Sequence, residues 1–292
     1  MVVVIIGASS GIGRALAKEL SRRGCKLALI ARRRALLEKL NEDLGGDHLV
    51  VEADVSRRED CNRAINLAFV HFKQIDTLVY CAGYGWAQPF SRMGHEEVAR
   101  LVETNLLGTI WSIQAVIPLM KAQSDRDGYT GQIVIVSSAC ARRGVPYMSV
   151  YSLSKAGQLN LTEALRPELA ADRIAVTSIH PFTVSETDFF SLIEKRSGYN
   201  PKAFVPGVMQ DMEFVIWAIR RSIERPCSEV WPKPFSRIML ICSIIFRPIT
   251  DWVLTRVHCR IFRSDNAILP SQSTGETKVR LRHRLIKRRL VR

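Results

Sequence analysis

Over roughly the first 180 residues, short apolar stretches alternate with segments whose apolar positions recur every three or four residues. The apolar stretches are rich in Val, Ile and Leu and predict buried strands at residues 2–6, 26–31, 48–51, 77–80, 132–136 and 174–179. Helical spacing fills the intervals, for example at 14–23 and 61–72. Strands that are apolar on both faces pair in parallel beneath helices, and their crossovers are right-handed. The pattern therefore predicts an α/β fold with a doubly wound parallel sheet, the Rossmann fold.

The pattern changes after the sixth strand. Residues 182–210 contain Pro, Gly, Phe and Ser without periodicity, which predicts a long substrate loop. Residues 235–253 are apolar on nearly every face of a helix, and Pro248 is expected to divide them into two helices. We therefore expect a Rossmann-type domain over 1–232, an apolar helical extension over 233–263 and a basic, flexible tail over 264–292.

Composition narrows the class of protein. The 292 residues are 47% hydrophobic and 24% charged, which excludes a mostly disordered chain or a fibre. The seven cysteines include no C-x-x-C pair and no His/Cys cluster with zinc spacing, so we expect no metal site and a reduced, cytoplasmic protein. The net charge is +14, and residues 251–292 contribute +8 of it, from 11 Lys and Arg against 3 Asp and Glu. A basic tail attracts nucleic acid only non-specifically, so no specific nucleic-acid partner is predicted.

Three glycines follow the first predicted strand and open a predicted helix, in the sequence Gly7-Ala8-Ser9-Ser10-Gly11-Ile12-Gly13. Glycines allow the backbone to turn tightly against a pyrophosphate, and a helix N-terminus presents free N–H groups to that anion. The same residues match G-x-S-x-G, the nucleophile elbow of hydrolases. That elbow needs an oxyanion loop from an earlier strand, and only one strand precedes Ser9. Dinucleotide binding is therefore the favoured interpretation.

The end of the second predicted strand bears on the choice of dinucleotide. An acidic residue there hydrogen-bonds the ribose 2′-hydroxyl of NAD, whereas arginine accommodates the 2′-phosphate of NADP. This chain has Arg32 and Arg33 and no acid at that point. A guanidinium pairs with phosphate through two hydrogen bonds. We therefore predict NADP(H), bound by Arg32 with help from Arg33 and Ser9.

Tyr151 and Lys155 are four residues apart at the start of a predicted helix and so project from the same face. A nearby ammonium stabilises tyrosinate, so we expect Lys155 to lower the pKa of Tyr151 and fit it for proton exchange with an alcohol or carbonyl oxygen. Ser138 ends a predicted strand and is placed to donate a hydrogen bond to the same oxygen. Asn105 is expected to hold a water or a backbone carbonyl near Lys155.

Taken together, these features resemble the short-chain dehydrogenase/reductase family over about residues 2–190. The matching positions, in family order and spacing, are 7–13, Asp54-Val55, Cys81-Ala82-Gly83, Asn105, Ser138, Tyr151 and Lys155. The resemblance implies that Tyr151 is the general acid/base, that Ser138 orients the carbonyl and that Asn105 supports a proton relay. It also implies that the cofactor contacts Gly7, Ser9, Ser10, Gly11, Ile12, Gly13, Arg32, Arg33, Asp54, Val55, Ala82, Gly83, Asn105, Tyr151, Lys155, Pro181 and Thr183.

The chain departs from the family pattern at two points in this region. Cys81 stands where the family has Asn, and Phe182 replaces the usual Gly after Pro181, so that the following threonine is most nearly Thr183 or Thr187. The cysteine, the arginines after the second strand and the apolar extension are also similar to 3-ketosphinganine reductase relatives. The predicted substrate pocket is largely aromatic and comprises Trp86, Phe90, Cys140, Tyr147, Phe182, Phe189 and Phe190.

These residues predict an NADP(H)-dependent oxidoreductase that interconverts an apolar or lipid-like ketone and its secondary alcohol. The alternative is a non-catalytic nucleotide-binding or membrane-associated protein on the same fold, which the intact set of Ser138, Tyr151 and Lys155 disfavours. Family resemblance implies a homo-oligomer, a dimer or a tetramer. The extension is expected to pack on the core or on a second subunit, or alternatively to lie on an anionic membrane surface, where the basic tail at 278–292 would be attracted.

Overall fold

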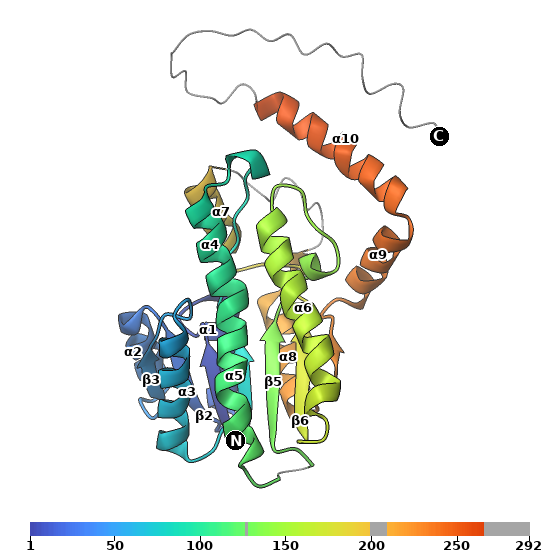
Figure 1. Ribbon diagram of the computed structural model, residues 1–292. Coiled ribbons are helices and arrows are strands. Elements are labelled where there is room, and N and C mark those ends of the chain that lie inside the picture. Colours follow the sequence, from blue (N-terminus) through green and yellow to red (C-terminus); the bar gives the residue numbers. More distant parts are fainter. Residues whose placement is uncertain (126–127, 199–208, 266–292) are drawn as a thin grey trace.

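A computed structural model describes residues 1–125, 128–198 and 209–265 of the chain (Figure 1). Within them lies a seven-stranded sheet of order β3-β2-β1-β4-β5-β6-β9, in which every pair of neighbours is parallel. The strands are β1 (Val2–Ile6), β2 (Lys26–Ala31), β3 (Leu49–Glu52), β4 (Thr77–Tyr80), β5 (Gly131–Val136), β6 (Ile174–Ile179) and β9 (Glu229–Val230). The Rossmann fold predicted from the apolar pattern is confirmed.

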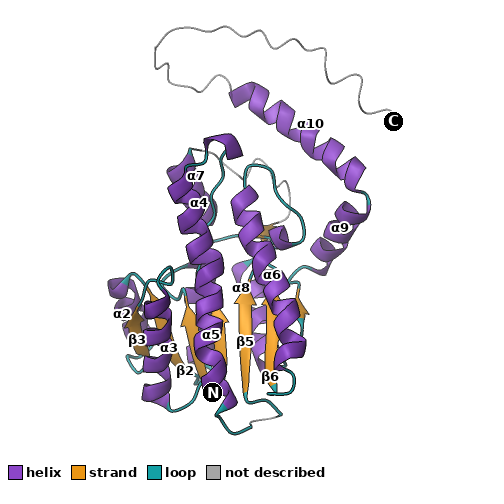
Figure 2. Ribbon diagram, viewed as in Figure 1, coloured by secondary structure: helices purple, strands orange, loops and turns teal. Residues whose placement is uncertain are grey.

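Helices cover both faces of this sheet (Figure 2). One layer contains α1 (Gly11–Arg22), α2 (Arg34–Asp43) and α8 (Met212–Glu224), and the other contains α3 (Arg58–Phe72), α5 (Gly108–Lys121) and α6 (Ser149–Leu169). Side chains alternate along each strand, so Val3 and Ile5 of β1 join the first layer's core while Val4 and Ile6 join the second. Every residue of β1 is buried, which explains why such strands are apolar throughout.

The order of the strands fixes where a ligand can bind. From β1 the chain runs outward through β2 to β3 and then crosses back to β4, which pairs with the other side of β1. Ligands of open α/β sheets bind where the strand order reverses, at the carboxyl ends of the strands. Gly7 follows β1 and Cys81 follows β4, so the glycine turn lies at this point.

Three predictions about the later part of the chain have different outcomes. Residues 182–210 are not without regular structure, because they include β7 (Thr183–Val184), α7 (Phe189–Ser197) and β8 (Met209–Gln210). The extension does form two helices, α9 (Pro234–Ile245) and α10 (Arg247–Asp265), which meet just before Pro248. Most of the predicted flexible tail, residues 266–292, lies outside the described residues.

In the described part of the chain, no single helix is long and apolar enough to cross a bilayer. The pair Arg237–Ile245 and Arg247–Arg256 passes that test of length and composition only as a combination, and its halves are bent by 103°.

Gly13 offers a test of how tightly the first turn packs. A Cβ at Gly13 would collide with the carbonyl oxygen of Gly7, which is backbone and cannot rotate away. We expect Gly13→Ala to lower the free energy of unfolding by about 1–3 kcal/mol, as overpacked sites do. Gly144→Ala is the matched control, because a Cβ there meets nothing within 4 Å. Urea unfolding would measure both, and equal stabilities would contradict the packing described.

Candidate active site

The glycine turn between β1 and α1, residues 7–13, forms a concave backbone surface that we call the glycine cradle. Gly7 has φ +91°, and a Cβ on it would lie 2.6 Å from the Ala82 nitrogen, so the turn after β1 is pressed against the chain after β4. Gly11 has φ +54° and open space where a Cβ would be. Ser10 precedes α1 but gives it no side-chain cap, which leaves the N–H groups of the first turn available to an anion. This geometry fits a dinucleotide pyrophosphate.

Arg33, more than Arg32, is held at this cradle. Its guanidinium donates hydrogen bonds to the hydroxyls of Ser9, at 2.9 Å, and Ser10, at 2.8 Å. Arg32 is instead turned toward Asp54, with 4.0 Å between its guanidinium and the carboxylate. The assignment of Arg32 as the main phosphate ligand, with help from Arg33 and Ser9, stays a prediction, and it is Arg33 that contacts Ser9 here.

Asp54 and Val55 continue the site beyond β3. The Asp54 carboxylate accepts hydrogen bonds from the backbone N–H and the hydroxyl of Ser56. Val55 is buried, and its carbonyl accepts the Cys61 thiol at 3.5 Å. A cavity of about 700 Å³ opens beside Arg32 and Asp54. Of the two predicted adenine-side residues, Asp54 therefore lines this cavity beside Arg32, whereas Val55 is buried next to it in sequence.

Tyr151 and Lys155 lie on the buried face of α6, with 7% and 5% of their surfaces exposed. The Lys155 ammonium donates to the carbonyl of Val136, at 3.1 Å, and to the Gln158 side chain, at 3.0 Å. It lies 5.8 Å from the centre of the Tyr151 ring. Ser138 follows β5, so the end of that strand and one turn of α6 bring the predicted three together.

Burial decides the proton affinities of this pair. Desolvation raises the pKa of the Tyr151 phenol above its ordinary value, and a hydrogen bond with Ser138 only partly opposes it. Desolvation also lowers the pKa of Lys155 to about 8. In the free chain the pKa of Tyr151 is therefore raised, against the expected lowering, and Lys155 is not among the groups that shift it.

Asn105 does not reach Lys155 directly. It lies in a π-helical turn, η2 (Glu103–Leu107), a feature that is frequent at functional sites. Its side chain accepts from the backbone N–H of Tyr84 at 3.0 Å and donates to the Tyr84 carbonyl at 2.9 Å. This clamp holds the chain after β4, next to Gly83, where a Cβ would lie 3.0 Å from the Asn105 oxygen.

Gln158 links the Asn105 backbone to the Lys155 ammonium. Its amide donates to the backbone carbonyl of Asn105, at 2.7 Å, and to the Thr109 hydroxyl, at 2.8 Å, while its oxygen accepts from Lys155. Sequence analysis missed this residue. The signal that would have found it is a polar residue seven positions after Tyr151, on the same buried helix face.

His180 is a second residue that sequence analysis missed. It is fully buried, with Nε2 3.0 Å from the Ser178 hydroxyl and Nδ1 3.3 Å from the carbonyl of Ser138. Its ring stacks on Trp231 with the centroids 4.5 Å apart. Next to it, the Pro181 carbonyl accepts the backbone N–H of Ala139 at 2.9 Å. The residues that follow β6 thus support the loop that carries Ser138. Thr183, another predicted cofactor contact, is the first residue of β7.

The predicted aromatic pocket is only partly assembled around Tyr151. Phe189 packs against the Tyr151 ring with a centroid distance of 5.5 Å, and Trp86 and Cys140 pack against the same cluster of buried residues. Phe190 is reached through Phe189, at 5.3 Å. The backbone N–H of Phe182 donates to Gln210, and Tyr147 lines a cavity of about 970 Å³ together with Cys140 and α10. Phe90 is 70% exposed and lies apart from the cluster.

Comparison with known proteins gives the class. The family model described as short chain dehydrogenase matches residues 1–197. The chain belongs to this family, as its motifs indicated. It is 38% identical over 187 residues to 11-beta-hydroxysteroid dehydrogenase 1A of Arabidopsis thaliana, a match that covers 62% of this chain and 51% of the relative. The chain therefore spans about half the length of that relative. It is 31% identical over 201 residues to an uncharacterised oxidoreductase of Listeria monocytogenes, covering 67% of this chain and 79% of the relative.

Solved structures agree with this assignment. A short chain dehydrogenase from Burkholderia cenocepacia in complex with NADP has a TM-score of 0.70 and 27% identity, covering 87% of this chain and 96% of that one. A 3-ketoacyl-(acyl-carrier-protein) reductase from Brucella melitensis complexed with NADH also has a TM-score of 0.70, with 25% identity, covering 79% and 95%. The likeness to 3-ketosphinganine reductase relatives stays a prediction.

His180 gives this site a pH-dependent stability. Burial lowers its pKa from 6.5 to about 4, so between these values the unfolded chain binds a proton that the folded chain does not. The contribution is complete above pH 6.5 and is lost as the pH falls, by about 2 kcal/mol at pH 5. Urea unfolding from pH 7 to pH 5 should show this loss in the wild-type chain and a smaller one in His180→Gln. Equal losses in both would show that His180 is not the group responsible.

Proposed function

We propose that this chain is an NADP(H)-dependent oxidoreductase that reduces an apolar ketone to a secondary alcohol and catalyses the reverse reaction. The observation that carries the proposal is a buried set of Ser138, Tyr151 and Lys155 beside a glycine cradle that fits a dinucleotide. A nicotinamide cofactor, when bound, would donate or accept the hydride. The family assignment and the names of the relatives support an exchange between carbonyl and alcohol.

Tyr151 acts as the general acid in this proposal. Its raised pKa keeps the phenol protonated at neutral pH, which is the state needed to give a proton to a carbonyl oxygen. Ser138 donates a hydrogen bond to the same oxygen as negative charge develops there. Lys155, with a pKa of about 8, exchanges protons near neutral pH and is placed to restore the phenol's proton. Gln158 holds the Lys155 nitrogen in place.

Arg33 is proposed to select NADP(H) by pairing with the 2′-phosphate. Its hydrogen bonds to Ser9 and Ser10 fix the guanidinium at the cradle, and the nearby chain after β2 offers no carboxylate to a ribose hydroxyl. The complex of the Burkholderia cenocepacia relative with NADP is in keeping with this choice. One solved relative binds NADP and another binds NADH, so the relatives do not favour either cofactor for this chain. The proposed preference for NADP(H) therefore depends on Arg33.

The substrate is proposed to be apolar because Trp86, Phe189 and Ile193 surround the Tyr151 ring. The names of the relatives include a hydroxysteroid dehydrogenase and a ketoacyl reductase, both of which imply largely hydrocarbon substrates. Assembly into a homo-oligomer stays a prediction from the family.

Tyr151→Phe tests the proton donor. Loss of the hydroxyl should lower kcat by about 10²–10⁴-fold, while the Kd for NADPH stays within a few fold. Turnover is measured as NADPH oxidation against a panel of apolar ketones of increasing length, and the Kd by fluorescence titration. Tyr129→Phe, on an exposed loop remote from the site, is the control. Full turnover by Tyr151→Phe would refute the assignment, and a wild-type chain that binds NADPH but reduces nothing would favour the non-catalytic alternative.

Arg33→Ala tests the cofactor preference. Removing a charged phosphate partner should raise the KM for NADPH by about 10–100-fold and leave the KM for NADH nearly unchanged. Arg22→Ala is the control, since Arg22 ends α1 with 74% of its side chain exposed and lies at the other end of that helix from the cradle. Arg32→Asp, measured in the same way, compares the contributions of the two arginines to NADPH binding. A larger rise in the KM for NADPH for Arg32→Asp than for Arg33→Ala would support Arg32 as the main phosphate ligand, as predicted from the sequence.

A further inference from the structure

The helices α9 and α10 leave an unusual number of large apolar side chains in contact with solvent. Between 36% and 68% of the surface is exposed in each of Phe235, Ile238, Met239, Ile241, Ile245, Phe246, Ile249, Trp252 and Val253. We call this set the extension surface. Single exposed apolar residues are ordinary, but a contiguous group marks a site of contact with another apolar body.

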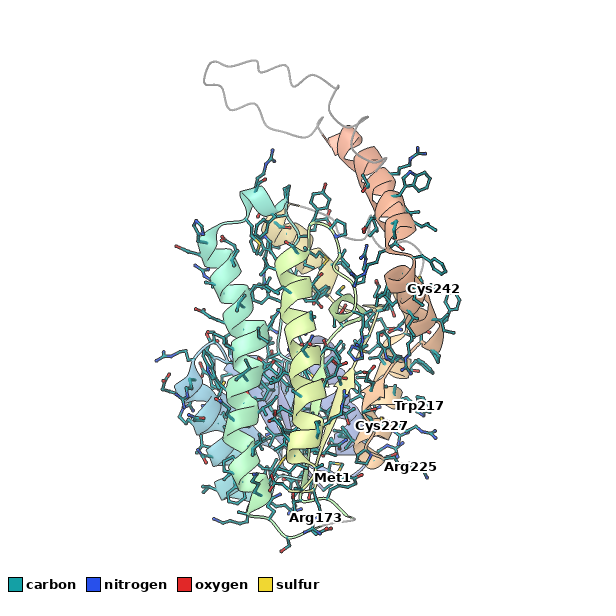
Figure 3. All side chains as sticks on the ribbon, turned by 45° about the vertical axis from the view of Figure 1, so that its right-hand side comes forward. Met1, Arg173, Trp217, Arg225, Cys227 and Cys242 are labelled. Carbon is teal, nitrogen blue, oxygen red and sulfur yellow. The ribbon has the colours of Figure 1, made fainter. Side chains whose placement is uncertain are left out.

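The position of the helices explains the exposure. They follow β9 and lie beyond the carboxyl ends of the strands, outside the two layers that cover the sheet (Figure 1). Leu240 is buried, and an ion pair between Asp251 and Arg143 ties α10 to the loop after β5. Figure 3 shows Cys242 of α9 on the outer side of the molecule. Within the described residues, the rest of the chain therefore covers only a narrow strip of the segment from 237 to 256.

Positive charge accompanies the extension surface. Arg237, Arg247 and Arg256 are exposed and form no ion pair with a carboxylate among the described residues. The Arg256 guanidinium lies 4.3 Å from the centre of the Trp252 ring. Asp251 is the sole acid in the sequence from 234 to 256, and Arg143 neutralises it. The surface thus combines aliphatic and aromatic side chains with unopposed guanidinium groups.

We propose that the extension surface binds an anionic phospholipid bilayer, with α9 and α10 lying in the plane of the interface. Apolar side chains would enter the boundary between headgroups and acyl chains, and the arginines would pair with lipid phosphates. The 103° bend and the modest length of each apolar half suit a surface position better than a crossing. Trp252 is of the residue type favoured at that depth.

Charge also argues against a second copy of the chain as the occupant. Each copy carries a net charge of +14, and a two-fold contact through this surface would bring its three arginines toward those of the partner. An anionic bilayer satisfies the same groups. The proposal concerns binding alone and requires neither cofactor nor turnover, so it stands or fails separately from the proposed reaction.

The test is co-sedimentation of the full-length protein with vesicles of phosphatidylcholine, with and without phosphatidylserine. Binding is expected mainly to the vesicles that contain phosphatidylserine and should weaken as salt is added. Ile249→Glu should lower the partition coefficient at least about tenfold, because it removes one inserted aliphatic side chain and adds a like charge. Val70→Glu on α3 is the matched control, since Val70 is 61% exposed and Ile249 62%.

Arg247→Glu should also weaken binding, by about tenfold or more, and Arg58→Glu at the start of α3 should not. Equal binding of wild type and Ile249→Glu would overturn the proposal and assign any attraction to the basic residues of 266–292. Equal binding to both kinds of vesicle would overturn the role of charge. A wild-type dimer that ignores vesicles and becomes monomeric in Ile249→Glu, seen by analytical ultracentrifugation, would identify a second copy as the occupant.

Discussion

The interaction on which the candidate site depends is the burial of one ammonium group. Lys155 lies on the buried face of α6 and donates to the last carbonyl of β5 and to Gln158, which in turn donates to the backbone carbonyl of Asn105. A buried ammonium is costly unless it is hydrogen-bonded. These partners meet that requirement and fix Lys155 on the helix face that also carries Tyr151.

The same burial acts in opposite directions on the two titrating groups. It keeps the Tyr151 phenol protonated and makes the Lys155 ammonium easier to deprotonate. A spacing of four residues shows that the groups share a helix face, but it contains no information about how much water that face excludes. The arrangement was therefore predictable from the sequence, and the direction of the tyrosine shift was not.

Other features were predictable or not for the same reason, namely whether they depend on local sequence or on tertiary contacts. The six long strands could be predicted because each is apolar on both faces, whereas the two residues of β9 are too few for a pattern. Phe189 and Ile193 of α7 pack in the same cluster as Tyr151, so tertiary contact rather than periodicity accounts for that helix. Ser138, Arg32 and Arg33 could be identified from the sequence because each lies at or just after the carboxyl end of a predicted strand. The hydrogen bonds of Arg33 with Ser9 and Ser10, and the contacts of Gln158 and His180, depend on neighbours distant in sequence.

The π-helical turn η2 constrains how the chain can change. It joins α4 (His95–Val102) to α5 and adds one residue per turn relative to an α-helix. The turn takes up one extra residue and leaves α4 and α5 in register, so a deletion within it that restores a regular α-helix would preserve that register. A deletion elsewhere in these helices would instead rotate one half against the other by about 100°. Asn105 contacts Tyr84 and Gly108 lies beside the Tyr80 hydroxyl, and such a rotation would break one of these contacts. Insertions and deletions in this stretch are thus a register problem for the contacts on either side of the turn.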